Sequence, residues 1–241
     1  MPAPTLGLHG NSQSTNGTTT TISVSTNAAN TILLVFTSIG STTTATPTLT
    51  IAGAGLTWSA LDPSYAASGA MLSGFGCANQ VWWAIAAAQL TAQTVTITSS
   101  ITIDAAATVY ASFTGAYTAA PIDPNAGAVP KLYYNSGTAT SPTGTFSSTN
   151  ADDVAVVMFG SNRNVATGWV GPAISLDSSH NVAGTRWATA DVGYQSFTAP
   201  QTGVVLTAGG SQTVWGTIGA MITADAPAGG GTAQARAVVM A

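Results

Sequence analysis

Apolar and hydroxyl-bearing residues alternate with a period of two along most of this chain, from about Thr20 to Thr223. Such alternation is typical of β-strands, because successive side chains point to opposite faces of a sheet. The residues that usually build exposed helix faces are almost missing: there is no glutamate and one lysine, and only 5% of the 241 residues are charged. Ordinary soluble domains carry roughly 25% charged residues. The pattern therefore predicts an all-β protein and argues against a largely helical one.

Runs of this kind are separated by clusters of Gly, Asn, Asp, Pro and Ser, which supply turn geometry. The predicted strands are 21–25, 31–38, 48–51, 81–87, 94–98, 108–114, 143–147, 154–160, 173–176, 186–194, 203–207 and 213–222. The alanine-rich stretch 83–90 is predicted to be a strand that leads into a turn, because it lacks helix caps and charged positions.

Two stretches of the chain resemble each other weakly. Residues 27–38 and 150–161 align with Asn, Ala, Phe and Ser identical, and Trp82 and Trp187 follow them in the same order. The preserved order favours two related halves, about 20–120 and 143–225, joined by a loop; chance similarity among strands of narrow composition is the alternative. Such strands pack as an antiparallel two-sheet β-sandwich of jelly-roll type. Residues 1–19 and 226–241 are then an N-terminal arm and a flexible C-terminal arm outside the sandwich.

Several function classes conflict with this composition. A net charge of −4 with four basic residues argues against nucleic acid as a partner, because phosphate binding needs clustered Lys and Arg. No run reaches ~18 apolar residues, so we expect no membrane span. Residues Met1–Thr5 lack the basic and apolar regions of a secretory signal, so we expect synthesis in the cytoplasm and no export by that route. Cys77 is the only cysteine, which excludes an intrachain disulfide and indicates a small, semi-buried thiol.

Groups for catalysis at neutral pH are scarce. The two histidines are His9, in the predicted N-terminal arm, and His180, in a predicted turn with Asp177. Asp177 and His180 could belong to a triad with a serine, but the sequence has no Gly-x-Ser-x-Gly elbow. A glycosidase needs two carboxylates across a cleft, and most of the eight aspartates fall at predicted turns, where hydrogen bonds to the backbone explain them. We therefore expect no enzyme, no catalytic residue and no cofactor.

Oxygen ligands for a calcium ion occur in weak form at two places. Residues 123–127, Asp-Pro-Asn-Ala-Gly, resemble the start of a calcium loop but are not followed by the bidentate glutamate. The pair Asp152 and Asp153 precedes a predicted strand. The sequence has no Cys/His cluster for zinc and no Gly-rich phosphate loop. We expect no metal, with a structural Ca²⁺ at either place as the alternative.

Tryptophan gives the clearest indication of a binding surface. Trp82 and Trp83 are adjacent on a predicted strand and therefore point to opposite faces. Trp83 belongs to the more apolar stripe with Val81 and Ile85, which places Trp82, and by the internal repeat Trp187, on the outer face. An outward tryptophan stacks on a sugar ring, covers a loop of its own chain or anchors a subunit interface. Trp82 and Trp187 are accordingly the candidate binding residues for a partner or a glycan.

The last residues of the sequence also predict an interaction. After 226–231, a linker by composition, the chain reaches Ala237-Val238-Val239-Met240-Ala241, which is apolar and β-prone. Docked on a neighbour's sheet edge, this segment would satisfy its backbone hydrogen bonds and bury its valines. Val238, Val239 and Met240 are the predicted assembly residues. The alternative is that they fold back onto their own sandwich.

A Thr-, Ser-, Ala- and Gly-rich β-sandwich with arms and no secretion signal resembles the decoration, head-fibre and tail-associated structural proteins of tailed bacteriophage virions. The resemblance covers residues 20–225, notably Asn30–Ser38, Trp82 with Trp83, and Thr213–Ile222. It implies a non-enzymatic protein on the virion surface that forms homo-oligomers and binds a major capsid or tail protein. The alternative is a carbohydrate-binding adhesin or receptor-binding module that binds surface glycans.

Overall fold

The computed structural model confirms the predicted all-β class. It describes residues 3–43, 47–61, 76–123, 143–148, 150–161, 169–170, 174–183, 186–208 and 215–224. These residues form thirteen strands, and the strand pairs are antiparallel. The described part of the chain contains no helix that is long and apolar enough to cross a membrane.

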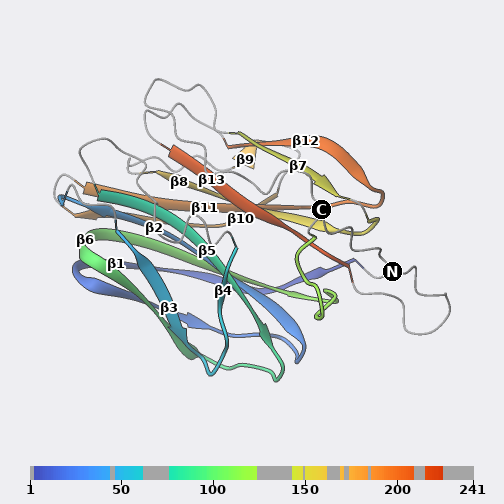
Figure 1. Cartoon of the computed structure of the whole chain (residues 1–241), viewed down its shortest axis with the longest axis horizontal. Coiled ribbons are helices and arrows are strands. Elements are labelled where there is room, and N and C mark those ends of the chain that lie inside the picture. The colour runs from blue at the N-terminus through green and yellow to red at the C-terminus, as the bar shows by residue number, and fades with distance from the viewer. Residues whose placement is uncertain are drawn as a thin grey trace, which may run out of the picture.

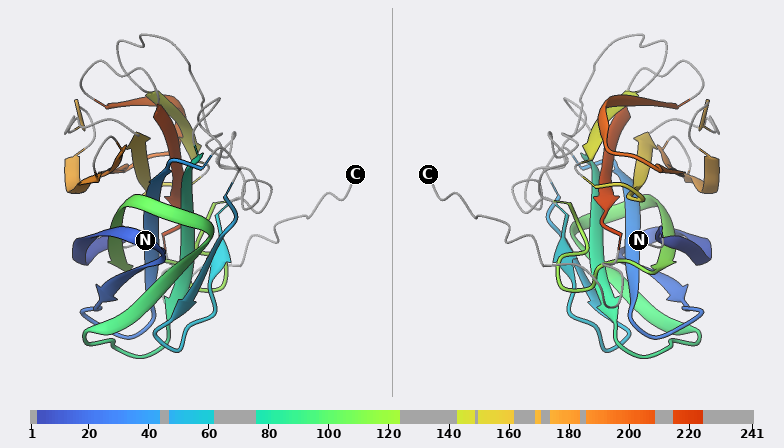
Figure 2. Two further views of the ribbon diagram at one scale, coloured as in Figure 1. Left: turned by 90° about the vertical axis from the view of Figure 1, so that its left-hand side faces the viewer. Right: turned by 90° about the vertical axis from the view of Figure 1, so that its right-hand side faces the viewer.

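The first sheet contains six strands from the N-terminal half of the chain (Figure 1). They are β1 (Thr5–Val24), β2 (Thr31–Ser41), β3 (Leu49–Gly53), β4 (Ser59–Ala60), β5 (Gly76–Ala86) and β6 (Gln93–Thr114). The order in the sheet is β1-β6-β2-β5-β4, and β3 also pairs with β6. β6 pairs with β3 through its first part and with β2 through its second part. Figure 2 shows how β6 curls between these two partners.

The remaining strands form two smaller sheets. The second sheet contains β8 (Val154–Ser161), β10 (Ile174–Ala183), β11 (Arg186–Ser196) and β13 (Trp215–Ile222), in the order β10-β11-β8-β13. The third contains β7 (Thr143–Ser148), β9 (Trp169–Val170) and β12 (Gln201–Ala208), in the order β7-β12-β9. The second sheet lies between the first and the third (Figure 1). Isolated bridges at Ala116↔Ala224 and Ile122↔Ile222 join the two halves of the chain.

Three apolar layers hold the sheets together. The central core, between the first and second sheets, gathers alternate residues of their strands, among them Phe36, Val81, Val109, Met158, Val192 and Ile218. An outer core on the far face of the first sheet surrounds Trp82 and Tyr110 and is covered by β3 and the turn that follows it. A smaller core between the second and third sheets contains Phe197 and Leu206. The molecule is thus a β-sandwich with an additional layer on each side; the jelly-roll topology remains a prediction.

β2 and β8 are the central strands of their sheets, and both are buried along their whole length. Their sequences, Thr-Ile-Leu-Leu-Val-Phe and Val-Ala-Val-Val-Met-Phe, are apolar without alternation. Strands that pack on both faces have this pattern, because neither face meets water. The two unbroken apolar runs therefore mark the two strands that lie deepest in the stack.

The same three-stranded unit occurs in both halves. β2 lies between β5 and β6, and β8 lies between β11 and β13. Each central strand follows a residue with left-handed backbone, Asn30 (φ 53°) and Asp152 (φ 64°). Superposing these turns places Phe36 and Met158, both in the central core, at equivalent positions. The sequence alignment instead pairs Asn30 with Asp153 and is out of register by one residue, so the descent of the two halves from one repeat remains a prediction.

Other sequence-based boundaries need correction. The expected N-terminal arm 1–19 belongs to a strand from Thr5 onward, since β1 pairs with β6 through most of its length. The predicted strands 94–98 and 108–114 are two parts of β6. The expected turn 177–181 lies inside β10. β1 escaped detection because most of its residues before Thr20 are exposed or half-buried, so they need no apolar alternation.

The first and second sheets approach backbone to backbone at one corner. A Cβ atom added to Gly40 of β2 would lie 2.6 Å from the carbonyl oxygen of Trp187 in β11. Real Cβ atoms do not come that close to a carbonyl oxygen, and glycine is the residue that permits such an approach. Gly40 therefore sets the spacing of the two sheets at this corner.

Candidate functional site

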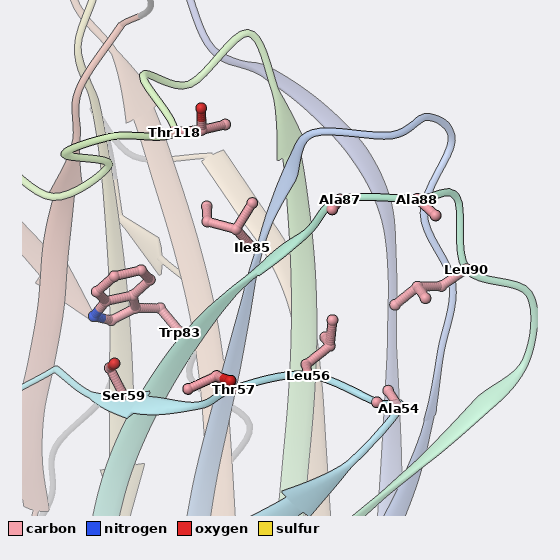
Figure 3. Close-up of a pocket in the computed structure, with 11 residues that line it drawn as sticks. Ala54, Leu56, Thr57, Ser59, Trp83, Ile85, Ala87, Ala88, Leu90 and Thr118 are labelled. Carbon is pink, nitrogen blue, oxygen red and sulfur yellow. The ribbon is translucent and has the colours of Figure 1, made fainter.

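A groove opens along the outer edge of β5 (Figure 3). It has a volume of about 630 Å³, and none of its lining residues is charged. The lining residues are Ala54, Gly55, Leu56, Thr57, Ser59, Trp83, Ile85, Ala87, Ala88, Leu90 and Thr118. We call this site the β5 groove. Its uncharged, mostly apolar wall favours an uncharged occupant.

The turn after β3 forms one wall of the groove. Gly53, Ala54 and Gly55 all have positive φ, which swings the chain away from β5. The Ala54 N–H donates to the Thr94 carbonyl oxygen of β6 (3.1 Å), and the indole N–H of Trp58 donates to the Gly53 carbonyl oxygen (3.2 Å). The first bond ties the turn to β6, and the second bond holds the two ends of the turn together.

The opposite wall is also held by hydrogen bonds. Leu90 and Thr26 are joined twice: the Leu90 N–H donates to Thr26 Oγ1 (3.0 Å), and the Thr26 N–H donates to the Leu90 carbonyl oxygen (3.0 Å). Next to Thr118, the Tyr117 N–H donates to the Thr223 carbonyl oxygen (2.9 Å). Both walls are therefore anchored to the sheets, and the β5 groove is preformed.

The floor of the groove is an incompletely covered sheet edge. β4 pairs with β5 at two positions, Ser59↔Trp83 and Ala60↔Trp82, and the Leu61 N–H donates to the Val81 carbonyl oxygen (2.9 Å). In an antiparallel ladder alternate residues direct their backbone groups to the same side. Since Val81 bonds toward β4, the backbone groups of Ile85 also point to this side. Beyond Trp83, no strand among the described residues pairs with this edge of β5.

The two adjacent tryptophans point to opposite faces of the first sheet, as predicted. Trp83 is half-buried, contacts the central core and lines the groove. Trp82 lies on the far face of the sheet, where it is 3% exposed and packs in the outer core. Trp82 is covered by its own chain, which was one of the three alternatives. The site residue on this strand is Trp83.

Trp187 does not occupy the position that corresponds to Trp82. Trp82 lies opposite Val35 of the central strand β2. Trp187 lies opposite Val182 of β10, beyond the last pair of β11 with β8 at Thr189. It is half-buried, beside the close approach at Gly40. Its proposed role in binding a partner or glycan remains a prediction.

The candidate catalytic residues lie on strands. His9 is exposed on β1 opposite Ala111. Asp177 and His180 lie on β10, opposite Val192 and Thr189 of β11, so the expected turn histidine is a strand residue. Asp191 lies on β11, within the predicted strand 186–194, and Asp104 lies on β6, between the predicted strands 94–98 and 108–114. Within the described residues, no three His, Cys, Asp or Glu side chains are grouped so that they could hold a metal ion.

Two of the three aspartates considered as calcium ligands, Asp123 and Asp153, come together where the halves meet. Both are buried, at 3% and 0% exposed. Asp153 Oδ1 accepts a hydrogen bond from the Ala224 N–H (3.0 Å), and Oδ2 accepts one from Asn150 Nδ2 (3.4 Å). Burial is the largest cause that raises the pKa of Asp153, the nearby Asp123 also raises it, and the bonds from Ala224 and Asn150 lower it; together these effects raise the pKa from 3.8 to about 6. Asp153 is therefore an acidic group with a raised pKa that lies beside a second buried carboxyl group.

Sequence reasoning missed both the groove and the carboxyl pair. Trp83 and Ile85 were assigned to a core stripe, and their exposure follows from the turn at Gly53, Ala54 and Gly55 far from them in sequence. That glycine-rich turn, followed by a very short strand, was the one signal for an uncovered edge. Nothing local to Asp123 or Asp153 indicates that they meet.

Several predicted site residues lie outside the described part of the chain. These are Val238, Val239 and Met240 of the expected assembly arm 226–241, and residues 124–127 of the weak calcium loop. The backbone of Cys77 lies in β5, opposite Gly40.

No known protein family, no curated protein and no solved structure matches this chain.

Proposed function

We propose that this protein is a non-enzymatic structural protein of a phage particle, of the decoration, fibre or tail-associated type, which assembles with copies of itself and with a capsid or tail protein. The observation that carries the proposal is the β5 groove. It is a preformed site of 630 Å³ without a charged side chain, and it opens onto backbone groups at a sheet edge. Such a site is suited to binding a chain or surface, and its described lining contains no carboxylate, histidine, lysine or cysteine that could act as an acid or base.

The composition supports the same proposal. With 5% charged residues and a net charge of −4, the chain has little long-range charge to steer or repel partners. Its exposed strand residues are mainly Thr, Ser, Asn and Gln, for instance along β1. A neutral hydroxyl-rich surface built on stacked sheets is what the resemblance to virion structural proteins implies.

Mass measurement and particle proteomics test the proposal together. Light scattering on the purified chain should give a multiple of 23.9 kDa, and the chain should co-purify with phage particles from its source at a fixed copy number. A chain that stays monomeric at high concentration and is absent from particles would contradict the proposal.

A second candidate function is the binding of a neutral glycan in the same groove. The half-buried Trp83 projects into it, with hydroxyl groups of Thr57, Ser59 and Thr118 in the same lining (Figure 3). An indole face stacks on sugar rings, and hydroxyls add hydrogen bonds. Titration with uncharged oligosaccharides tests this candidate: it requires saturable binding that Trp83→Ala abolishes and that Val205→Ala, at an exposed site outside the lining, leaves intact.

A further inference from the structure

The open part of β5 has the geometry of an acceptor for an added strand. Leu61 lies beside Val81 and Ser59 lies beside Trp83, so β4 extends the sheet at these two positions. At the next position, beside Ile85, no strand among the described residues pairs with β5. Thr57 would fill that position if β4 began earlier, but the turn 53–56 carries it away. An extended segment that enters the groove can therefore continue the ladder that β4 begins.

Two apolar sides of the groove, one on each face of the β5 edge, select the side chains of such a segment. Trp83 and Ile85 belong to the edge of the central core, and Leu56 and Leu90 belong to the edge of the outer core. Side chains of an added strand alternate between these two sides. Both sides are apolar, so a fitting strand is apolar at consecutive positions rather than at every second one.

Residues 237–241, Ala-Val-Val-Met-Ala, satisfy this requirement. Val238 and Met240 would face one wall and Val239 the other. The described chain ends at Ala224, which pairs with Ala116, two residues before Thr118 of the groove lining. Twelve residues, 225–236, then precede the segment and can span at most about 40 Å. This reach allows the segment to enter a groove on a neighbouring copy, and the proposed assembly function favours that groove over the one on the same chain.

We infer that residues 237–241 of one copy bind as an added strand in the β5 groove of another copy, and that this exchange forms the homo-oligomer. The inference rests on the proposed assembly function and specifies its acceptor site. It requires no charge complementarity, in agreement with a groove and a segment that are both uncharged.

Disulfide trapping between two full-length variants tests the inference. Both carry Cys77→Ser; one also carries Val239→Cys, and the other carries Thr57→Cys or Ala87→Cys, on opposite walls of the groove. Mixed under mild oxidation, at least one of the two pairs should give a covalent heterodimer. Val205→Cys on β12, 48% exposed and outside the groove, is the matched control and should not react. Trapping no better than this control for both groove positions overturns the inference, as does a disulfide that forms only within a single doubly substituted chain.

Charge insertion gives an independent readout. Val239→Asp should shift the oligomer to monomer in light scattering, because a carboxylate would be buried between two apolar walls. Val205→Asp, which adds the same charge at an exposed site, should leave the mass unchanged. If the wild-type chain assembles and Val239→Asp assembles equally well, the inference fails while the proposed function stands. If the wild-type chain does not assemble at all, the proposed function itself fails. Saturable binding of a neutral glycan that leaves assembly unchanged would assign the groove to the second candidate function and overturn the inference.

Discussion

β5 and β11 occupy corresponding places in the two three-stranded units, yet their outer edges are treated differently. β11 is covered by β10 from Ala183↔Arg186 to Ile174↔Tyr194. β5 is covered by β4 at two positions. An exposed edge invites pairing with other chains, and proteins usually block it. The edge of β11 follows that rule, whereas the edge of β5 departs from it beyond Trp83 and opens into the groove, which is why we assign interaction to β5.

The largest effect is expected where the two units are alike. Phe36→Ala in β2 and Met158→Ala in β8 remove equivalent side chains from the central core. Each should lower the free energy of unfolding by about 2–5 kcal/mol. Because both units share this core, urea unfolding of each variant should remain a single transition. Two separate transitions would show that the two units unfold independently and do not share one core.

The second prediction concerns the pH dependence of stability, in which the two units differ because only one has a buried carboxyl group at this position. Asp153 precedes β8, whereas its equivalent in the first half is the neutral Thr31, the first residue of β2, whose hydroxyl donates to the Ala28 carbonyl oxygen (2.9 Å). The pKa of Asp153 is raised from 3.8 to about 6, so the folded state binds its proton more tightly than the unfolded state. This contribution to stability is fully present below pH ~4 and is lost as the pH rises through 6, by about 3 kcal/mol in total.

Unfolding free energies measured between pH 4 and 7 check this sign. Asp153→Asn keeps the shape without the titration and should flatten the profile in that window. A wild-type profile that instead rises steadily from pH 4 to 6 would contradict the assignment, and an unchanged profile in Asp153→Asn would place the titration elsewhere.

A smaller effect concerns the corner where the sheets touch. Gly40→Ala should lower the unfolding free energy by about 1–3 kcal/mol, because the added methyl group meets the Trp187 carbonyl oxygen. Gly17→Ala on β1, where a Cβ would meet only ordinary contacts, is the control and should stay within about 0.5 kcal/mol of wild type. Equal effects of the two substitutions would mean that the close approach at Gly40 does not limit the packing of the units.

The smallest expected effect is a difference in amide hydrogen exchange along the open edge of β5. Along β5, the Trp83 amide is covered by β4 and the Ile85 amide faces the groove. In Val239→Asp, hydrogen exchange should therefore be faster at Ile85 than at Trp83. In the wild-type oligomer the two rates should approach each other, because the added strand protects Ile85. Equal protection of both amides in the variant would indicate that the edge is already closed.

Much of the strand map was predictable from the sequence, and what covers each strand was not. Unbroken apolar runs located β2 and β8, and an alternating run located β11, because apolar content is a local property. Trp82 and Trp83 were assigned to the correct faces, but the burial of Trp82 was not predictable, because the turn after β3 that covers it lies far away in sequence. The meeting of Asp123 with Asp153 depends on how the halves join, which no local pattern encodes.

The pairing of β1 with β6 also constrains how the molecule comes into existence. Thr5 lies opposite Thr114, so the first strand is made more than a hundred residues before its partner. At a synthesis rate of about 5–20 residues per second, the nascent N-terminus waits on the order of ten seconds at a ribosome. During that interval β2, apolar on both faces, has been synthesised without β5 or β6 beside it. Because its strands pair over such long separations in sequence, we expect the first sheet to close late and slowly during folding. Until it closes, the exposed β2 is a segment that a chaperone can bind.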